Sequence, residues 1–290
     1  MEITLQFSRI NFQIHTEKKI EIDTVLEKFV CANTGAADIT LLVSWDWKTH
    51  AVPTVSMMGN DLVQNYYIEP NAYLCETQGG VRGAVAMCRC ASDFSHIQCV
   101  LNLENYSYIP KQMDFIMRTL PMRAIFQQFG TLFFHAAQIT VNGAGILFTA
   151  PSGTGKTTQA KLWETYRSAN RVCADRTLVR RLAEGWRTFG YPLDGSEPIC
   201  SAEEHALGAV VLLRQGRENT VVRLTGGRAV AALMPQMVID GWNAQARIRA
   251  AELITDLLEE IPVYQLTCVP DETAVQCLGQ RLVNDGVIGV

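Results

Sequence analysis

The segment from residue 145 to residue 167 constrains the fold of this chain more than any other. It begins with a short apolar run, Gly145-Ile146-Leu147-Phe148-Thr149, and continues as Ala150-Pro151-Ser152-Gly153-Thr154-Gly155-Lys156-Thr157-Thr158. Ala160, Trp163 and Tyr166 then recur at helical spacing up to Arg167. A buried strand, a glycine-rich turn and an amphipathic helix in this order predict an α/β unit with an anion site at the helix N-terminus.

Each residue type in the turn has a mechanical reason for its place. Gly153 and Gly155 let the backbone turn its N–H groups inward around a polyphosphate. Lys156 can reach the β- and γ-phosphates, and the Thr157 hydroxyl can ligate Mg²⁺. The segment matches the phosphate-loop (Walker A) pattern G-x-x-x-x-G-K-[ST], except that Ala150 replaces the first glycine. The expected ATP-binding residues are therefore Ser152, Gly153, Thr154, Gly155, Lys156, Thr157 and Thr158.

Phosphate chemistry also needs a carboxylate near the metal or the nucleophile, and Asp175 is the candidate. It follows the predicted strand 171–174 and stands 19 residues after Lys156. An acidic side chain at the carboxyl end of a buried strand faces the same crevice as a phosphate loop. The sequence therefore predicts that Asp175 acts in catalysis and as a Mg²⁺ ligand with Thr157. A solvated or capping aspartate is the structural alternative.

Strands and helices alternate in the second half of the chain. Asn142-Gly143 is a strong two-residue turn signal between apolar runs. Further strands are expected at 131–134, 138–141, 209–213, 221–224 and 263–266, and helices at 157–167, 229–237, 244–260 and from Asp271 to about Val283. This pattern predicts a P-loop domain over 131–290, in which helices cover a sheet.

The first 110 residues show a period of two instead. Ile3, Leu5 and Phe7 alternate with polar residues, as do Ile39, Leu41 and Val43, which predicts half-buried strands of an antiparallel sheet. Turns are expected at 33–35 and 78–80. Residues 111–130 then show helical spacing, with Pro121 as an interruption and Gly130 as the end. The expected organisation is α+β overall, with a β-rich domain (1–110), a helical connector (111–130) and the P-loop domain (131–290).

The composition of the chain argues against some classes of binding partner. Charged residues make up 19% of the 290 residues with a net charge of -4, and no long basic run suggests nucleic acid. No window approaches 18 uninterrupted apolar residues, and the N-terminus does not resemble a signal peptide. The nine cysteines are odd in number and irregularly spaced, which favours reduced thiols and a cytoplasmic location.

A family resemblance joins these features. The stretch 134–158, with Phe134-His135-Ala136-Ala137 ahead of the loop, followed by Ala174-Asp175-Arg176, resembles the HPr serine kinase/phosphorylase family. That family shares a nucleotide-binding fold with phosphoenolpyruvate carboxykinases. The resemblance covers about residues 115–285 and is sharp from 134 to 177. It does not extend to the first 110 residues.

The resemblance implies roles by position. Asp175 would accept the proton of an acceptor hydroxyl or orient it beside Mg²⁺. His135 would lie close to the phosphates and position the transferring group or the aspartate, whereas a packed core histidine is the structural alternative. Arg176 would neutralise phosphate charge in the transition state, or else face solvent. HPr kinases form oligomers, which implies a homo-oligomer here.

The chain also departs from that family. HPr kinases carry two aspartates after the alanine, whereas Arg176 stands at the second position here. Their later glycine-rich signature is not recognisable, although 190–196 occupies the place of a substrate-side loop. The departures argue against HPr as substrate. They favour a kinase of the divergent HPr-kinase-like type, some of whose members phosphorylate a serine in a precursor peptide.

Two functions follow from these expectations. The first is transfer of the γ-phosphoryl group of ATP to a hydroxyl, either a serine of a peptide or protein or a small molecule, with the first domain recognising the acceptor. The alternative is a nucleotide-dependent regulatory or binding protein with little or no transferase activity.

Overall fold

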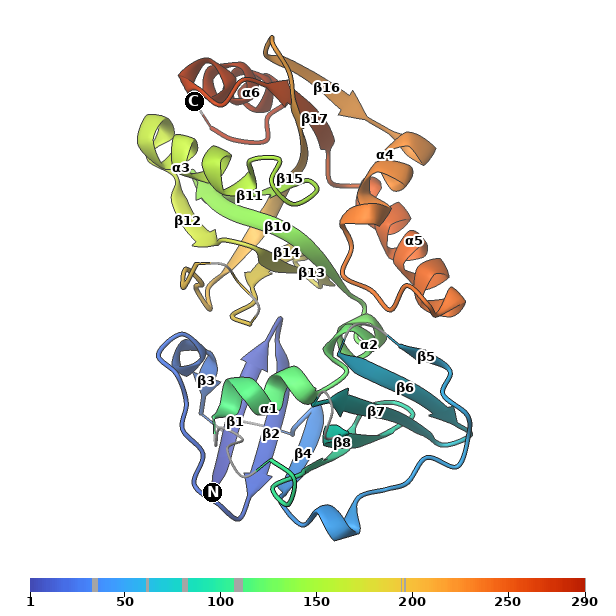
Figure 1. The fold of residues 1–290 in the computed structure, drawn as a ribbon. Coiled ribbons are helices and arrows are strands. Elements are labelled where there is room, and N and C mark those ends of the chain that lie inside the picture. Colours follow the sequence, from blue (N-terminus) through green and yellow to red (C-terminus); the bar gives the residue numbers. More distant parts are fainter. Residues whose placement is uncertain are drawn as a thin grey trace. The chain divides into compact units, whose positions relative to one another are not determined.

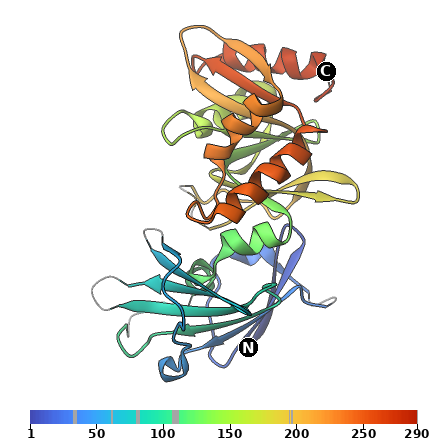
Figure 2. The same cartoon turned by 90° about the vertical axis from the view of Figure 1, so that its right-hand side faces the viewer.

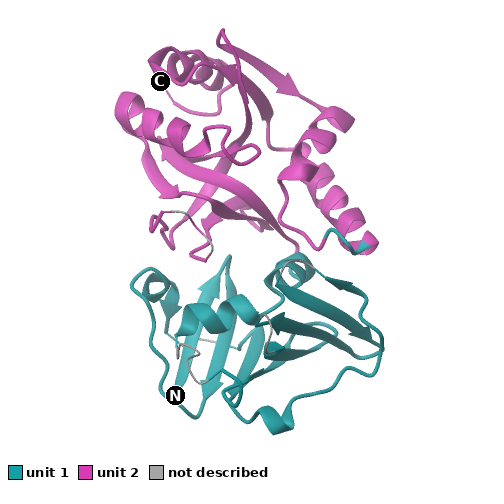
Figure 3. Ribbon diagram, in the orientation of Figure 1, with its two compact units in different colours: residues 1–129, 241–243 teal, residues 130–240, 244–290 magenta. Residues whose placement is uncertain are grey.

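The computed structural model describes residues 1–32, 36–60, 63–79, 83–106, 112–193, 195 and 197–289. The turns expected at 33–35 and at Gly80, and Asp194 and Ser196 of the 190–196 loop, lie outside the described residues. The chain divides into two compact units, Met1–Phe129 with Gly241–Asn243 and Gly130–Asp240 with Ala244–Val290 (Figure 3). Each unit is built on its own large sheet, and the expected mixed α/β class is confirmed.

The first unit contains a nine-stranded sheet in the order β3-β1-β2-β4-β9-β8-β7-β6-β5 (Figure 1). Its strands are β1 (Glu2–Phe7), β2 (Ile10–Thr16), β3 (Val30–Cys31), β4 (Ile39–Ser44), β5 (Gly59–Asn60), β6 (Gln64–Glu69), β7 (Ala72–Gln78), β8 (Ala84–Ala91) and β9 (His96–Leu101). Two short 3-10 helices, Leu26–Phe29 and Trp47–Thr49, lie in the connections.

The period of two is confirmed for this sheet, but its expected antiparallel pairing is only partly correct. Leu5, Phe7, Ile39 and Leu41 are buried, as the alternation predicts. β1 and β2 pair antiparallel, whereas β2 with β4 and β4 with β9 pair parallel. The connection between β2 and β4 returns the chain to the same end of the sheet, so the two strands run in one direction. Side-chain alternation does not report strand direction.

The region expected as a connector forms two helices, α1 (Met113–Thr119) and α2 (Met122–Gln128), which belong to the first unit. They are separated at Pro121, which has no backbone N–H to continue a helix. Gly130 follows α2 with φ of 67°, a conformation that glycine adopts without steric cost.

The second unit contains an eight-stranded sheet in the order β11-β10-β13-β14-β15-β17-β16, with β12 paired to β10 and β11 also paired to β15. Its strands are β10 (Thr131–Val141), β11 (Ala144–Thr149), β12 (Asn170–Cys173), β13 (Arg176–Leu182), β14 (Gly185–Gly190), β15 (Glu204–Gln215), β16 (Thr220–Leu224) and β17 (Val263–Cys268). Its helices are α3 (Lys156–Arg167), α4 (Gly226–Leu233), α5 (Ala244–Leu258) and α6 (Glu272–Asn284), with a 3-10 turn at Met234–Gln236.

Most expected elements of this unit are present, with three corrections. The two short strands expected at 131–134 and 138–141 are one continuous strand, β10, because His135 to Ala137 stay within the ladder. β13 and β14 were not expected. β15 begins at Glu204 and not at Ala209, because Glu204, His205 and Ala206 pair with β14.

Two helical layers cover opposite faces of this sheet. Apolar residues of α3 and α6 pack on one face with Ala137, Ile139 and Phe148, whereas those of α4 and α5 pack on the other with Phe134 and Leu147. In Figure 2 the orange helices α4 and α5 lie in front of the sheet. The side chains of neighbouring residues on β10 therefore point to different layers, and His135 lies on the face that packs against α3.

Within the described residues, no helix has both the length and the apolar character that a membrane crossing requires.

Candidate functional site

The expected phosphate loop joins the end of β11 to the first residue of α3. Gly153 and Gly155 have φ of 79° and 115°, and Gly155 is the residue that precedes the helix. A Cβ atom at either position would meet nothing within 4 Å, so glycine is required for the backbone angle and not for space. Ser152 and Thr158 are exposed, and Thr154 and Thr157 are partly buried. The backbone of the loop is therefore not covered by side chains at its two glycines, and it lies at the start of a twelve-residue helix.

The structure explains why alanine is tolerated where the motif has its first glycine. Ala150 is fully buried in the layer formed with α3 and α6. Among the described residues, five non-glycine residues have positive φ, and Ala150 is not one of them. The first position of this loop needs a small side chain and an ordinary backbone angle, and Ala150 supplies both.

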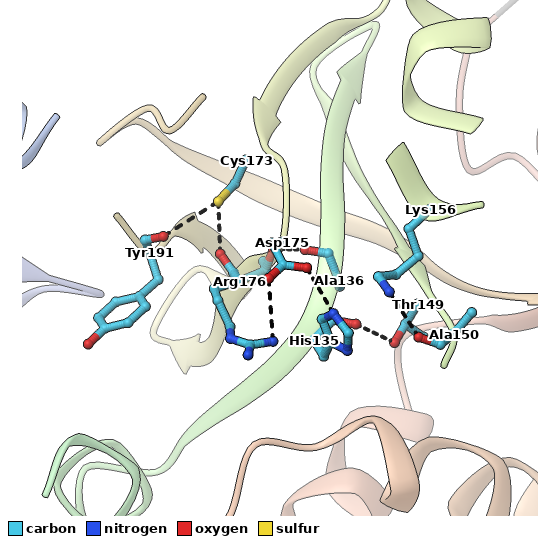
Figure 4. Close-up of polar contacts among 10 residues, drawn as sticks. His135, Ala136, Thr149, Ala150, Lys156, Cys173, Asp175, Arg176 and Tyr191 are labelled. Carbon is cyan, nitrogen blue, oxygen red and sulfur yellow. Dashed lines mark hydrogen bonds and ion pairs between the residues drawn. The ribbon is translucent and has the colours of Figure 1, made fainter. Parts of the chain in front are cut away.

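Lys156 points back into the loop. Its Nζ donates a hydrogen bond of 3.1 Å to the Ala150 carbonyl oxygen, and the side chain is buried (Figure 4). Burial lowers the pKa of Lys156 from its ordinary value; the negative charge of Asp175 opposes that shift and the positive charge of Arg176 adds to it. The carboxylate of Asp175 and the guanidinium of Arg176 are therefore close enough to the Lys156 ammonium to change its pKa.

The sheet brings Asp175 to the same place by a different route. β11 and β12 flank β10 and both run antiparallel to it, and their last residues lie opposite the middle of β10, at Ala136 and Gln138. Thr149, the last residue of β11, lies opposite Ala136, and the Ala136 N–H donates to the Asp175 carbonyl oxygen at 3.0 Å. The loop with Lys156 and the bend with Asp175 therefore leave the sheet on either side of His135 and Ala136.

Asp175 lies in a bend that interrupts the ladder between β12 and β13. Its carboxylate Oδ1 is 2.8 Å from Nε2 of His135, and its Oδ2 is 3.7 Å from Nη1 of Arg176. All three side chains are partly exposed, so they can meet a ligand. The structure brings together the four residues predicted for catalysis: His135, Lys156, Asp175 and Arg176.

Burial and the neighbouring charges together determine the protonation of His135. Burial is the largest cause of a lowered pKa of His135, and the positive charge of Lys156 acts in the same direction, while Asp175 opposes both. At neutral pH the imidazole is therefore uncharged, and the contact is a hydrogen bond that Nε2–H donates to the carboxylate.

Thr157 is the other residue predicted to ligate Mg²⁺ with Asp175. Its side chain lies on the first turn of α3 and is not hydrogen-bonded to Asp175 in the described part of the chain.

A protein-family model, "SynChlorMet cassette protein ScmC", matches residues 99–271, more than half of the chain. The chain belongs to the ScmC family. The matched residues of this ScmC family member include the phosphate loop, His135 and Asp175. Among solved structures, one similar chain is the HPr(Ser) kinase/phosphatase from Coxiella burnetii, at 11% identity and a TM-score of 0.32, over 53% of the present chain and 95% of that one. A search of curated proteins finds no match.

The sequence analysis did not identify the residues that hold this candidate site in shape. Thr149 is fully buried and its Oγ1 donates to the His135 carbonyl oxygen at 2.9 Å, and Thr177 Oγ1 donates to the Ala136 carbonyl at 3.1 Å. The Cys173 thiol donates to the Arg176 carbonyl at 2.9 Å across the bend. No motif marks these positions. Only the register of β11, β12 and β13 on β10 shows that their side chains meet this short stretch of backbone.

The lowered pKa of His135 makes a prediction about acid stability. An unfolded chain, with a histidine pKa of about 6.5, binds the proton more readily than the folded chain. His135 therefore contributes stability that is complete above that pH and is lost as pH falls through the lowered pKa. We expect His135→Gln to lose less stability than wild type between about pH 7.5 and pH 5, measured as urea midpoints.

His205 serves as the internal reference in that experiment. Its pKa is also lowered, chiefly by burial, and it is present in both proteins, so the difference between the two pH profiles isolates His135. Parallel profiles would show that His135 titrates normally.

Proposed function

We propose that this chain is an ATP-dependent kinase that transfers the γ-phosphoryl group to an acceptor hydroxyl. The observation that carries the proposal is the position of two groups on either side of the middle of β10. Lys156 follows β11 in a glycine loop, and the carboxylate of Asp175 follows β12 and accepts from His135. A phosphate anchor beside an oriented carboxylate is what transfer to a hydroxyl requires.

The loop residues fit a nucleoside triphosphate. Within the described residues, the Ala150 carbonyl is the one hydrogen-bond acceptor for Nζ of Lys156, so two of the three ammonium N–H groups remain for phosphate oxygens. The open space at Gly153 and Gly155 admits a polyphosphate close to the backbone. Thr157 and Asp175 would hold Mg²⁺, which neutralises phosphate charge when it is bound.

The proposed step uses the side chains in distinct roles. The acceptor oxygen forms a bond to the γ-phosphorus, the bond from that phosphorus to the β–γ bridging oxygen breaks, and ADP retains the bonding electrons. The proton of the hydroxyl passes to Asp175, whose carboxylate keeps free lone pairs beside its contact with His135. Lys156 and Arg176 offset the negative charge of the transferring group.

We propose a serine of a peptide or protein, or a small molecule, as the acceptor, with the first unit as its recognition module. We also propose that the protein acts in the cytoplasm and as a homo-oligomer, as the resemblance to HPr kinases suggests.

The test follows γ-labelled ATP. The purified chain is incubated with Mg²⁺ and a size-fractionated extract of its host, with Lys156→Ala as control. We expect label on a peptide, protein or metabolite that is absent with the variant. Label recovered only as inorganic phosphate, or left on ATP, would contradict the kinase and favour a nucleotide-dependent regulatory protein.

A further inference from the structure

We propose that Cys173 and Cys200 are a redox modification site, and that a disulfide between them switches off the candidate catalytic carboxylate two residues away. The regulatory part rests on the proposed kinase function, whereas formation of the disulfide does not.

The backbone places these two cysteines directly opposite each other. Cys173 and Cys200 form an isolated antiparallel bridge, and the Ser201 N–H donates to the Val172 carbonyl at 2.8 Å. This hydrogen bond joins the residues on either side of the pair, so the cysteines occupy the narrow, non-hydrogen-bonded type of site. There Cα atoms are about 4.5 Å apart, which lies within the range that disulfides span.

The two side chains also point the same way. A Cβ atom placed on Gly190 would lie 2.7 Å from the sulfur of Cys200 and 3.5 Å from Cβ of Cys173. Both cysteines therefore border the space that Gly190 leaves open. Neither cysteine forms a disulfide in this structure, and both are almost fully buried. A bond between the sulfurs requires rotation of side chains and little movement of the backbone.

The link to the site runs through the hydrogen bonds of Cys173. Its thiol donates across the bend to the Arg176 carbonyl at 2.9 Å and lies 3.6 Å from the Tyr191 carbonyl (Figure 4). A disulfide has no S–H, so the Arg176 carbonyl would lose this donor. The bend between Cys173 and Arg176 contains Asp175, and its carboxylate must stay within 2.8 Å of His135 to keep the observed contact. Oxidation thus removes a hydrogen bond that holds the bend in its observed conformation.

The chemistry needs a two-electron oxidant, and a peroxide suffices. One thiolate attacks a peroxide oxygen, the O–O bond of hydrogen peroxide breaks, and a sulfenic acid and water form. The second sulfur then displaces the sulfenic hydroxyl, which leaves as a second water, and the S–S bond forms. The two thiols together lose two electrons and two hydrogens, and the peroxide gains them. A dithiol reverses the reaction by exchange.

The test exposes the full-length chain to hydrogen peroxide, blocks remaining thiols by alkylation and digests the protein with trypsin. Cys173 lies in the peptide 172–176 and Cys200 in the peptide 188–214, so their disulfide is one cross-linked mass lacking two hydrogens. We expect this species, an at least tenfold loss of phosphoryl transfer, and recovery of both with dithiothreitol. Cys200→Ser should prevent the cross-link and keep activity in peroxide.

Cys277→Ser is the matched control, because Cys277 is a partly exposed free thiol of the same unit that contacts the Asn219 carbonyl. Its loss should change neither the cross-link nor the reversible inactivation. If other cysteines oxidise while peptides 172–176 and 188–214 remain separate, Cys173 and Cys200 are not the redox site. If the cross-link forms and phosphoryl transfer continues at full rate, the disulfide does not regulate the activity.

A second readout separates this proposal from the proposed function. The ¹⁵N signals of the His135 imidazole report its contact with Asp175 whether or not the protein transfers phosphate. Oxidation should shift them in wild type and leave them unchanged in Cys200→Ser. A cross-linked protein with unshifted His135 signals would overturn the coupling, even if no kinase activity exists in any form.

Discussion

Lys156→Ala should reduce phosphoryl transfer by on the order of 10²- to 10³-fold or more, which is the loss typical of removing one preorganised charge from a transition state. The Nζ of Lys156 is buried beside the loop carbonyl of Ala150 and shares its surroundings with Asp175. No other lysine lies in the loop 150–158. Nucleotide affinity should fall as well, because the lysine contacts phosphates in the ground state and in the transition state.

The measurement combines transfer from γ-labelled ATP with calorimetric titration of ATP. Lys161→Ala is the matched control, since Lys161 lies on the same helix and pairs with Glu197 at the surface. An exposed pair of this kind contributes about 0–1 kcal/mol, so the control should fold, bind and transfer like wild type. Equal activity of Lys156→Ala and the control would remove Lys156 from the mechanism and leave the glycine loop without a catalytic role.

Asp175→Asn should lower the transfer rate at saturating ATP by about 10²- to 10⁴-fold and ATP affinity by a smaller factor. The proposed Mg²⁺ contact acts in the ground state, whereas a general base acts only as the hydroxyl proton leaves. Asparagine has nearly the same shape, and its amide oxygen can accept the hydrogen bond from Nε2 of His135. The substitution therefore removes the negative charge and the basicity and keeps the local contact.

The check is a rate measurement at saturating ATP together with a thermal unfolding scan. Asp256→Asn is the matched control, since Asp256 is exposed on α5, outside the candidate site. A stable Asp175→Asn protein that transfers phosphate at the wild-type rate would show that Asp175 does not take the proton. A loss of ATP affinity as large as the loss of rate would leave Asp175 with metal binding alone and would remove its role as the base.

The sequence was sufficient for the local parts of this arrangement. The loop, its preceding strand and its helix follow from glycine, apolar period and a lysine at the helix start, which are properties of neighbouring residues. It could not show that β10 is continuous through His135, because a polar residue between apolar runs predicts a break equally well. β13 was missed for a similar reason, since Arg176, Arg180 and Arg181 obscure its alternation.

The proximity of His135 to Asp175 depends on strand register, which no short pattern encodes. Their positions are 40 residues apart in the chain, and only the pairing of β10 with β12 and β13 joins them. The same holds for Cys173 and Cys200, whose spacing of 27 residues suggested nothing. The family resemblance named Asp175 and His135 without supplying a geometric reason for either.

The flanking of β10 by β11 and β12 also sets the span of the site. Neighbouring strands are about 4.8 Å apart, so the ends of β11 and β12 are separated by about 10 Å whatever the chain does between them. The spacing of 19 residues between Lys156 and Asp175 in the sequence therefore does not set the distance between them in the structure. Natural insertions after α3 would lengthen the connection without moving either group. Relatives with very different spacing would keep the same site, and a search by fixed motif distance would overlook them.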